Sequence, residues 1–599
     1  MREESRLDKK YNAKHYLSII IVFLLASVSS LILATEIFQE TSIPEETVRG
    51  ELAQKIDLYL KRITPFGFSG ALLVAKDGHV ILNKGYGWAI RSSHIPNTSE
   101  TVFSTGSLTK QFTAAGIMKL KMMGKLKTED SLTKFFKDIP PDKGQITLHH
   151  LLTHTAGVIN YTGLDYEKAR REETVKKILE APLLFKPGQR FHYSNAGYSL
   201  LAAVIEKVSG QSYEQFLHQN LFQPASMKFT GYIIPDWSKK VVAHWYVGDK
   251  DNGTPLEKAY PYWNLLGNGG ILTTTADMYR WHLALLGHKV LSEQAKKKIF
   301  TPYLNNYGYG WDVLKTDHGL LIQHDGGSML GNSAEMRRYL EAKIVTILFC
   351  NQSFDHKALF EVVRDKIETL VFGGEVSIPP KVNLLTPKEL AKFEGEYKFK
   401  RGGHLRIRAA DGQLLVTPEN QAAVTALYFS EKTNQNYLKE ISALSLSAFR
   451  AALENNYTPL AEVLYNRDKR LAAVRALVGQ RLAEFRKREG EIRDILVEEV
   501  LPSNFRGKET TVVYLKLKGK RRNLYFELYW QGKKNVGIGP SPGAPNLKLP
   551  FMSVGNNEFA GYQIEMAFNL FIKFNFDRNG SVSGLTVIKK KGRLSASKL

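Results

Sequence analysis

The sequence predicts an α+β protein, and three patterns support that fold class. Alternating apolar residues flank Asp77-Gly78, a pair suited to the positive φ angles of a tight hairpin turn. Apolar residues then recur at helical spacing over most of residues 107–290, and strand patterns return between residues 320 and 351. Hairpin strands that are separated from later strands by a long helical insert are typical of an α+β core.

The expected elements of this core follow one another from residue 45 to residue 375. The helix that opens at Ser107 carries apolar residues every three or four positions and is expected to stop at Gly124. In chain order we expect a helix over 48–61, strands over 70–75 and 79–82, the helix from 107, strands over 320–323, 333–339 and 343–351, and a last helix over 356–372.

Composition and charge narrow the class of protein. With 599 residues the chain is too long for one core, and 43% hydrophobic with 24% charged residues is typical of a soluble globular protein. The net charge of +23 lies mainly in the C-terminal third, where basic residues alternate with apolar ones, as in 513–518. This alternation favours a solvated sheet face over a nucleic-acid site, and it leaves association with an anionic membrane or cell wall open.

Cysteine and histidine usage gives no sign of a metal or cofactor. Cys350 is the only cysteine, so no intrachain disulfide can form, and we expect a buried, inert thiol. The fifteen histidines include no His-Glu-x-x-His or comparable spacing. We therefore expect no metal and no cofactor, and the sequence does not predict an oligomeric state.

Residues 1–40 are typical of an export segment. A basic start is followed by the uncharged apolar stretch 17–33, whose length lies between a signal-peptide core and a membrane span. A cleaved signal peptide is favoured over a retained anchor. The protein is thus expected to be exported, periplasmic or extracellular, and held at the membrane by residues 17–33 if they are kept.

Beyond a proline-containing linker over 377–387, the C-terminal third is expected to be mainly β. Short strand patterns give way to an amphipathic helical stretch, and strands then resume up to a final hairpin at Asp577-Arg578-Asn579-Gly580. The expected segments are strands over 393–397, 405–407 and 414–416, helix over 448–500, and strands over 511–517 and 524–530.

A Ser-x-x-Lys tetrad offers a nucleophile with its own base. A serine hydroxyl needs a base at hydrogen-bonding distance, and a desolvated lysine three positions later on a helix can supply it. The tetrad occurs at Ser107 with Lys110, at Ser131 and at Ser595. Only Ser107 follows a glycine and opens a strongly periodic helix, whereas Ser131 is expected to be a cap or turn residue and Ser595 to lie in a frayed terminus.

Two further elements complete the candidate site. Tyr193-Ser194-Asn195 supplies a phenol that can relay a proton and an amide that can orient a substrate, and a helical run follows it. Tyr-x-Asn also occurs at 262–264 and 303–305, without that setting. His324-Asp325-Gly326 is the only His-x-Gly, and the neighbouring Gly327 can offer an unobstructed N–H to an oxyanion.

With these elements the chain resembles the serine β-lactamase-like family, which includes class C β-lactamases, DD-peptidases, D-aminopeptidases and family VIII esterases. The resemblance covers residues of about 45 to 370 and rests on three elements in the family's order. It implies the DD-peptidase fold, an antiparallel sheet flanked by helices beside a helical subdomain. The similar stretches are Val102–Leu120, Ile146–Val158, Phe185–Met227 and Gly267–Trp281.

The resemblance also implies the roles of the residues. Ser107 would be the acyl-accepting nucleophile, and Lys110 and Tyr193 would act as general base and acid. Asn195 would position the substrate, and the N–H groups of Ser107 and Gly327 would form the oxyanion hole. The substrate would be a small molecule or a short peptide. His154, in a segment typical of the family, is interpreted as structural rather than catalytic.

One departure from the family pattern bears on the substrate. Class C β-lactamases have Lys-Thr-Gly or a close variant as the third substrate-binding element, where this chain has His324-Asp325-Gly326. A lysine there pairs with a substrate carboxylate, whereas histidine is largely neutral near pH 7 and Asp325 repels an anion if it faces the cleft. An ester or a D-aminoacyl peptide is therefore expected over a β-lactam. The alternative is a non-catalytic scaffold protein or binder of cell-wall peptides.

The C-terminal third resembles the lipocalin-like β domain that is often appended to these hydrolases. Phe393–Tyr397 and Gly580–Val587 carry that resemblance. The expected domain consists of residues 385–441 and 546–599. Residues 442–545 would then be an α+β insert with a weak similarity to nuclear-transport-factor-like domains.

Overall fold

The computed structural model describes the chain from Glu46 to its C-terminus, with short gaps. The gaps are residues 259, 354–357, 401, 411, 430–432, 463–470, 472, 506–507, 542, 545–546, 564–567 and 590–591. The expected export segment, residues 1–40 with its apolar stretch 17–33, lies outside the described residues. Of the helices that are described, none has both the length and the apolar character needed to cross a membrane.

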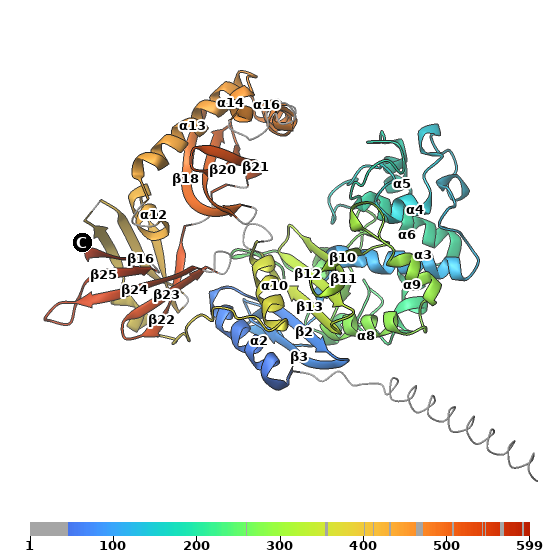
Figure 1. Ribbon diagram of the computed structural model, residues 1–599, viewed down its shortest axis with the longest axis horizontal. Helices are drawn as coiled ribbons and strands as arrows, with labels where there is room; N and C mark the ends of the chain where they lie inside the picture. The colour runs from blue at the N-terminus through green and yellow to red at the C-terminus, as the bar shows by residue number, and fades with distance from the viewer. Residues whose placement is uncertain are drawn as a thin grey trace, which may run out of the picture. The chain divides into compact units, whose positions relative to one another are not determined.

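An antiparallel sheet forms the centre of the first domain (Figure 1). In the described part of the chain it has seven strands in the order β1-β3-β2-β13-β12-β11-β10. The β2–β3 hairpin turns at Asp77 and Gly78, which have φ of 51° and 80°, as the sequence predicts. The strands are β1 (Thr47–Val48), β2 (Gly70–Lys76), β3 (His79–Tyr86), β10 (Asp312–Thr316), β11 (Gly319–Ser328), β12 (Asn332–Tyr339) and β13 (Ile344–Cys350).

Helices cover both faces of this sheet. Leu72, Val74 and Leu348 pack in one buried cluster with α2 (Gly50–Ile63) and α10 (Ala358–Val371). A further helix, α8 (Thr275–Leu286), packs against strands β2 and β13 of the same sheet. Because side chains alternate between the two faces of a strand, the buried Leu73, between Leu72 and Val74, points toward the second face. This is the α+β core that the sequence predicts, with the antiparallel sheet that the resemblance implies.

The helical insert forms a second layer of packing around α6 (Asn195–Ser209) (Figure 1). Every residue of α6 from Ala196 to Ile205 is buried, because α3, α4, α5 and α7 all pack against it. The surrounding helices are α3 (Thr109–Met122), α4 (Leu148–Leu152), α5 (Arg171–Glu180), α7 (Tyr213–Leu217) and α9 (Glu293–Ile299). The start of α3 and the start of α6 carry the first two elements of the candidate site.

The C-terminal region contains a closed barrel of eight strands, in agreement with a lipocalin-like extension. Its interior is filled by apolar and aromatic side chains such as Phe393, Phe559 and Phe574, whose rings lie 4.5–5.5 Å apart between centroids. The strands are β15 (Gly395–Phe399), β16 (His404–Ala410), β17 (Gln413–Pro418), β22 (Leu549–Gly555), β23 (Glu558–Gln563), β24 (Phe568–Phe576), β25 (Val582–Lys589) and β26 (Gly592–Lys598).

Between β17 and β22 the chain forms helices and then a four-stranded antiparallel sheet. The sheet consists of β18 to β21, and α13 contacts both β18 and β19. The elements are α12 (Gln421–Tyr428), α13 (Gln435–Leu453), α14 (Thr458–Glu462), α16 (Gln480–Glu489), β18 (Asp494–Phe505), β19 (Lys508–Lys518), β20 (Asn523–Gln531) and β21 (Lys534–Ser541).

Three expectations for this region need correction. The boundary at residue 442 falls inside α13, so the insert begins closer to the N-terminus. The helical stretch ends at Glu489, because Asp494–Phe505 pairs with β19 as a strand. Ser595 lies in barrel strand β26, paired with Thr586, and not in a frayed terminus.

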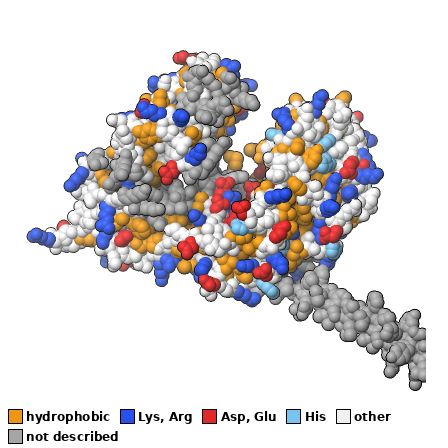
Figure 2. Space-filling model, viewed as in Figure 1, with side chains coloured by type: hydrophobic (Ala, Val, Ile, Leu, Met, Phe, Trp, Pro, Cys, Tyr) orange, Lys and Arg blue, Asp and Glu red, His pale blue; other side chains and the backbone are white. Residues whose placement is uncertain are grey.

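The surface shown in Figure 2 carries its basic side chains in scattered positions. Lys and Arg lie singly or in small groups among other residue types on this face, and they do not form one continuous patch. Within the C-terminal third, strand β19 alternates as its sequence pattern predicts, with Val513, Leu515 and Leu517 buried and Lys516 and Lys518 not buried.

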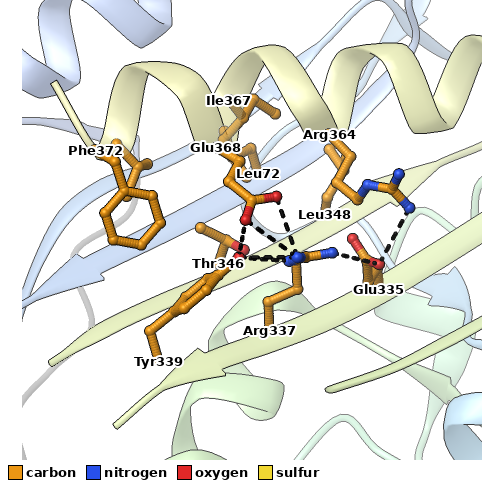
Figure 3. A pocket seen from close by; sticks show the side chains of 11 residues that line it. Leu72, Glu335, Arg337, Tyr339, Thr346, Leu348, Arg364, Ile367, Glu368 and Phe372 are labelled. Atoms are coloured by element: carbon orange, nitrogen blue, oxygen red, sulfur yellow. Dashed lines mark hydrogen bonds and ion pairs between the residues drawn. The ribbon is translucent and has the colours of Figure 1, made fainter. Parts of the chain in front are cut away.

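A buried ionic cluster lies between β12 and α10 (Figure 3). Arg337 is at its centre, with Glu335 3.4 Å away on the same strand and Glu368 of α10 3.1 Å away. Arg364 approaches Glu335 at 3.7 Å, and Tyr339 donates a hydrogen bond to Glu368. Burial raises the pKa of Glu335 to about 7, although Arg337 and Arg364 lower it.

Replacing Arg337 with Met is expected to destabilise the first domain by about 3–5 kcal/mol, because it leaves the buried carboxylate of Glu335 and the partly buried carboxylate of Glu368 without their shared cation. Urea unfolding at neutral pH, followed by intrinsic fluorescence, measures the change. The matched control is Arg364→Met, which removes the more distant partner and should cost less. An Arg337→Met protein as stable as the parent would contradict this assignment.

Candidate active site

Ser107 lies in a short 3₁₀ turn, Gly106–Leu108, that leads directly into α3. Among residues 101–110 it is the one residue that is not buried. Gly106 has φ of +51°, and a β-carbon at this position would lie 2.3 Å from the amide nitrogen of Gly327. Only glycine allows this approach of the turn to β11, so Gly106 determines how Ser107 meets the third element.

Lys110 lies on the first turn of α3 and points back at Ser107. Its Nζ is 3.0 Å from Ser107 Oγ, and it also donates hydrogen bonds to Asn195 Oδ1 and to the carbonyl oxygen of Asn268, both at 2.7 Å. Burial lowers the pKa of Lys110 well below its ordinary value, while the nearby carboxylates of Asp165 and Asp325 favour the charged form. A lysine with a depressed pKa beside a serine hydroxyl can accept that hydroxyl's proton.

Tyr193 is the second group at the nucleophile. Burial raises its pKa well above the ordinary value, and a hydrogen bond with the Ser107 side chain acts in the opposite direction. Lys110 Nζ lies 4.7 Å from the centroid of the Tyr193 ring. Since Tyr193 stays a neutral phenol while the pKa of Lys110 is lowered, the arrangement favours Lys110 as the base and Tyr193 as a proton donor or relay.

Asn195 begins α6, and its position is set by hydrogen bonds on both sides. Ser194 is the N-cap, with its side chain accepting from the Gly197 amide at 2.9 Å. The Asn195 amide donates to Asn160 Oδ1 at 3.0 Å. The Asn195 side chain is thereby held where its Oδ1 accepts from Lys110, so the first two elements meet at one ammonium group.

The third element lies on β11 beside the turn that carries Ser107. His324 is buried and bonds to the Tyr307 hydroxyl through Nε2 at 2.9 Å and to the carbonyl oxygen of Asp325 through Nδ1 at 2.6 Å. Asp325 lies opposite Glu335 on the neighbouring strand, so its side chain projects from the same sheet face, the one that α10 covers. The side chain of His324 projects from the opposite face. Asp325 is nevertheless close enough to influence the pKa of both Lys110 and Tyr193.

The turn that carries Ser107 and the Gly326-Gly327 backbone of β11 approach each other closely. A β-carbon on Gly326 would lie only 2.5 Å from the amide nitrogen of Ser107, and one on Gly106 would lie 2.3 Å from that of Gly327. Gly327 itself is exposed. The amide nitrogens of Ser107 and Gly327 thus both lie at the close contact of β11 with the turn, where the resemblance places an oxyanion hole.

The other copies of the motifs lie elsewhere. Ser131 caps a 3₁₀ turn through the Thr133 amide, and Lys134 forms an ion pair with Asp130 at 2.7 Å instead of approaching the serine. Ser595 is exposed on the barrel. The Asn264 side chain is bonded to Thr162, and Tyr303 is exposed. The structure therefore brings together Ser107, Lys110, Tyr193, Asn195 and His324-Asp325-Gly326-Gly327.

Sequence reasoning missed several residues that hold the site together. Asn160 fixes the start of α6, the Asn268 carbonyl accepts from Lys110, and the Tyr307 hydroxyl binds His324. Asn268 lies in a segment with a family resemblance, which was a usable signal. Asn160 and Tyr307 are in loops with no pattern of their own, so only the fold reveals their role.

Comparison with known proteins identifies relatives of the first domain. A family model described as Beta-lactamase matches residues 64–366. Putative penicillin-binding protein PbpX of Bacillus subtilis is 32% identical over 53% of this chain and 78% of its own length. Penicillin-binding protein 4* of the same organism is 27% identical over 61% of this chain and 87% of its own. A solved penicillin-binding protein from Bacillus halodurans is 31% identical over 49% of this chain and 94% of its own, with a TM-score of 0.44.

Proposed function

Because the chain belongs to the beta-lactamase family, we propose that it is a serine hydrolase that forms an acyl-enzyme on Ser107 and acts on an ester or a D-aminoacyl amide in preference to a β-lactam. The observation that carries the proposal is the contact of Lys110 Nζ with Ser107 Oγ at 3.0 Å, made by a buried lysine with a lowered pKa.

The proposed reaction has two steps. Lys110 accepts the proton of Ser107 as Oγ attacks the carbonyl carbon, and the amides of Ser107 and Gly327 stabilise the negative charge on the carbonyl oxygen. Tyr193 donates a proton to the leaving oxygen or nitrogen as the bond to the carbonyl carbon breaks. A water molecule then gives a proton to the Tyr193 phenolate as it attacks the acyl carbonyl carbon, and Lys110 returns its proton to Ser107 Oγ as the bond between Oγ and the acyl carbon breaks and the acid is released.

The charges around the site support the choice of substrate. Lys110 is influenced by Asp165 and Asp325, and Tyr193 by Asp325 and Asp312. Asp325 projects from the sheet face opposite His324, so it acts on the site only at longer range, and burial raises the pKa of Asp165 and raises that of Asp312 to about 6. In their ionised forms these groups disfavour a substrate with a carboxylate near the scissile bond, as in a penicillin. They do not repel a neutral ester, and they attract the ammonium group of an aminoacyl amide. The buried His324 supplies no fixed positive charge of the kind that a lysine in that position provides.

Two probes on the purified full-length protein test the proposal in one gel. A fluorescent fluorophosphonate labels an activated serine, and a fluorescent penicillin reports recognition of a β-lactam. We expect strong fluorophosphonate labelling and weaker penicillin labelling. No labelling by either probe, together with no turnover of p-nitrophenyl butyrate or of D- and L-alanine p-nitroanilide, would instead favour the non-catalytic binder.

Exchanging the third element is expected to shift the substrate preference. A lysine that reaches a substrate carboxylate contributes about 1–3 kcal/mol, or about 5- to 150-fold in rate. His324→Lys combined with Asp325→Thr should therefore raise turnover of a chromogenic cephalosporin relative to p-nitrophenyl butyrate, and Asp325→Thr alone is the matched control. If the parent already hydrolyses the cephalosporin faster than the ester, the third element does not disfavour β-lactams.

A further inference from the structure

His154 occupies an unusual backbone position just after α4. Its φ is +55°, a left-handed conformation that costs energy for any residue with a side chain. The residue is 1% exposed. A strained, fully buried histidine next to a reactive group needs a local reason, and the reason lies in its contacts with the Tyr193-Ser194-Asn195 element.

His154 forms hydrogen bonds to the residues immediately before and after Tyr193. Its carbonyl oxygen accepts a hydrogen bond from the His192 amide at 2.8 Å, and its Nδ1 accepts one from the Ser194 amide at 3.1 Å. The imidazole lies against the Tyr193 ring, with 4.3 Å between the centroids and 36° between the planes. Both amides that flank Tyr193 are therefore bonded to the same residue, and the ring of Tyr193 packs on it as well.

These contacts determine the protonation state of His154. Because Nδ1 accepts a hydrogen bond, the proton of the neutral ring is on Nε2, which is buried and has no hydrogen-bond partner among the described residues. An imidazolium would place a second N–H opposite the Ser194 amide. Burial and the nearby charges of Lys110, His324 and His192 lower the pKa of His154 well below its ordinary value.

We propose that His154 is a positioning residue. Its neutral imidazole holds the Tyr193-Ser194-Asn195 element so that the Tyr193 hydroxyl contacts Ser107 and the side-chain oxygen of Asn195 contacts Lys110. This inference rests on the proposed serine hydrolase function. It goes beyond the interpretation of His154 as merely structural, because the residue acts on the proton path. The left-handed backbone turns its side chain toward Ser194, and Nδ1 then fixes the residue that links the two functional side chains.

Variants at position 154 separate the hydrogen bond from the backbone strain. Glycine accepts a positive φ but removes the acceptor, whereas asparagine tolerates the same φ and places Oδ1 near the position of Nδ1. We expect His154→Gly to lower kcat for p-nitrophenyl butyrate by about 10- to 100-fold with KM changed less than about 3-fold. His154→Asn should recover most of that loss at a melting temperature similar to that of His154→Gly.

A double-mutant cycle identifies what His154 positions. In a Tyr193→Phe background, the same His154→Gly change should lower kcat by much less, because the hydroxyl that it helps to place is already absent. An equal effect in both backgrounds would overturn the proposal. So would a His154→Gly protein that loses thermal stability but keeps its kcat, or a His154→Asn protein no better than the glycine variant.

One readout does not depend on activity. Nitrogen-15 NMR of the histidine-labelled protein should show His154 as the neutral ring protonated on Nε2 between pH 6 and 8, and the signal is assigned by its loss in His154→Asn. A ring protonated on Nδ1, or an imidazolium at pH 6, would overturn the positioning role. If this tautomer is observed but no substrate is turned over, the proposed hydrolase function is wrong, while the hydrogen bond from the Ser194 amide to His154 Nδ1 is confirmed.

Discussion

Replacing Ser107 with Ala is expected to lower hydrolysis of p-nitrophenyl butyrate by at least about 10⁴-fold and to abolish labelling by the fluorophosphonate, because no other oxygen takes its place as nucleophile. Ser107 is the partly exposed residue of its turn, and it lies beside Lys110 and at the close contact of the turn with the Gly326-Gly327 backbone. Initial rates and in-gel fluorescence measure the two effects.

Ser131→Ala is the matched control, since it removes the serine of a second Ser-x-x-Lys tetrad. The lysine of that tetrad, Lys134, is engaged with Asp130, and the hydroxyl of Ser131 caps a turn. We expect near-normal activity with at most a modest loss of stability. A Ser107→Ala protein that labels as well as the parent would show that the nucleophile has been assigned to the wrong residue.

Removing either proton-transfer group should reduce the rate by about 10²–10⁴-fold, the range for a lost general acid or base. Lys110→Ala removes the base that contacts Ser107, and Tyr193→Phe removes the phenol without changing the ring. The double variant is expected to be no slower than the slower single one, because the two groups serve the same proton path. Steady-state kinetics on the ester provide all three numbers.

Lys110→Arg is the sharper control for the base. Arginine keeps the positive charge but stays protonated at any pH used for the assay, so it cannot accept the proton of Ser107. It should be as inactive as Lys110→Ala. Substantial activity in Lys110→Arg would mean that the positive charge is needed and the base lies elsewhere, and full activity in Tyr193→Phe would exclude the phenol from the relay.

The sequence predicts those parts of the fold and site that depend on local spacing. Ser107 and Lys110 are three residues apart on one helix, so their contact follows from helix geometry alone. The β2–β3 hairpin was likewise predictable from Asp77-Gly78, whose backbone conformation few other pairs adopt. Fold class followed from the order of such segments, and the family resemblance supplied the topology.

Features set by tertiary structure were not predictable. The register of β11 against β12 decides that Asp325 shares a sheet face with Glu335, and a shift by one residue would reverse it. His154 shows its role only when its positive φ and its contact with the Ser194 amide are known. The segment from Asp494 has helix-like amphipathic spacing, yet pairing with β19 makes it a strand.

Mapping the site of the fluorophosphonate adduct by tandem mass spectrometry tests most directly whether Ser107 is the nucleophile. The purified protein is labelled to completion, digested and sequenced, and the same digest of Ser107→Ala serves as the reference. We predict one stoichiometric adduct, on Ser107, and none in the variant. A stoichiometric adduct on any other residue, or an unchanged adduct in Ser107→Ala, would contradict this mechanism.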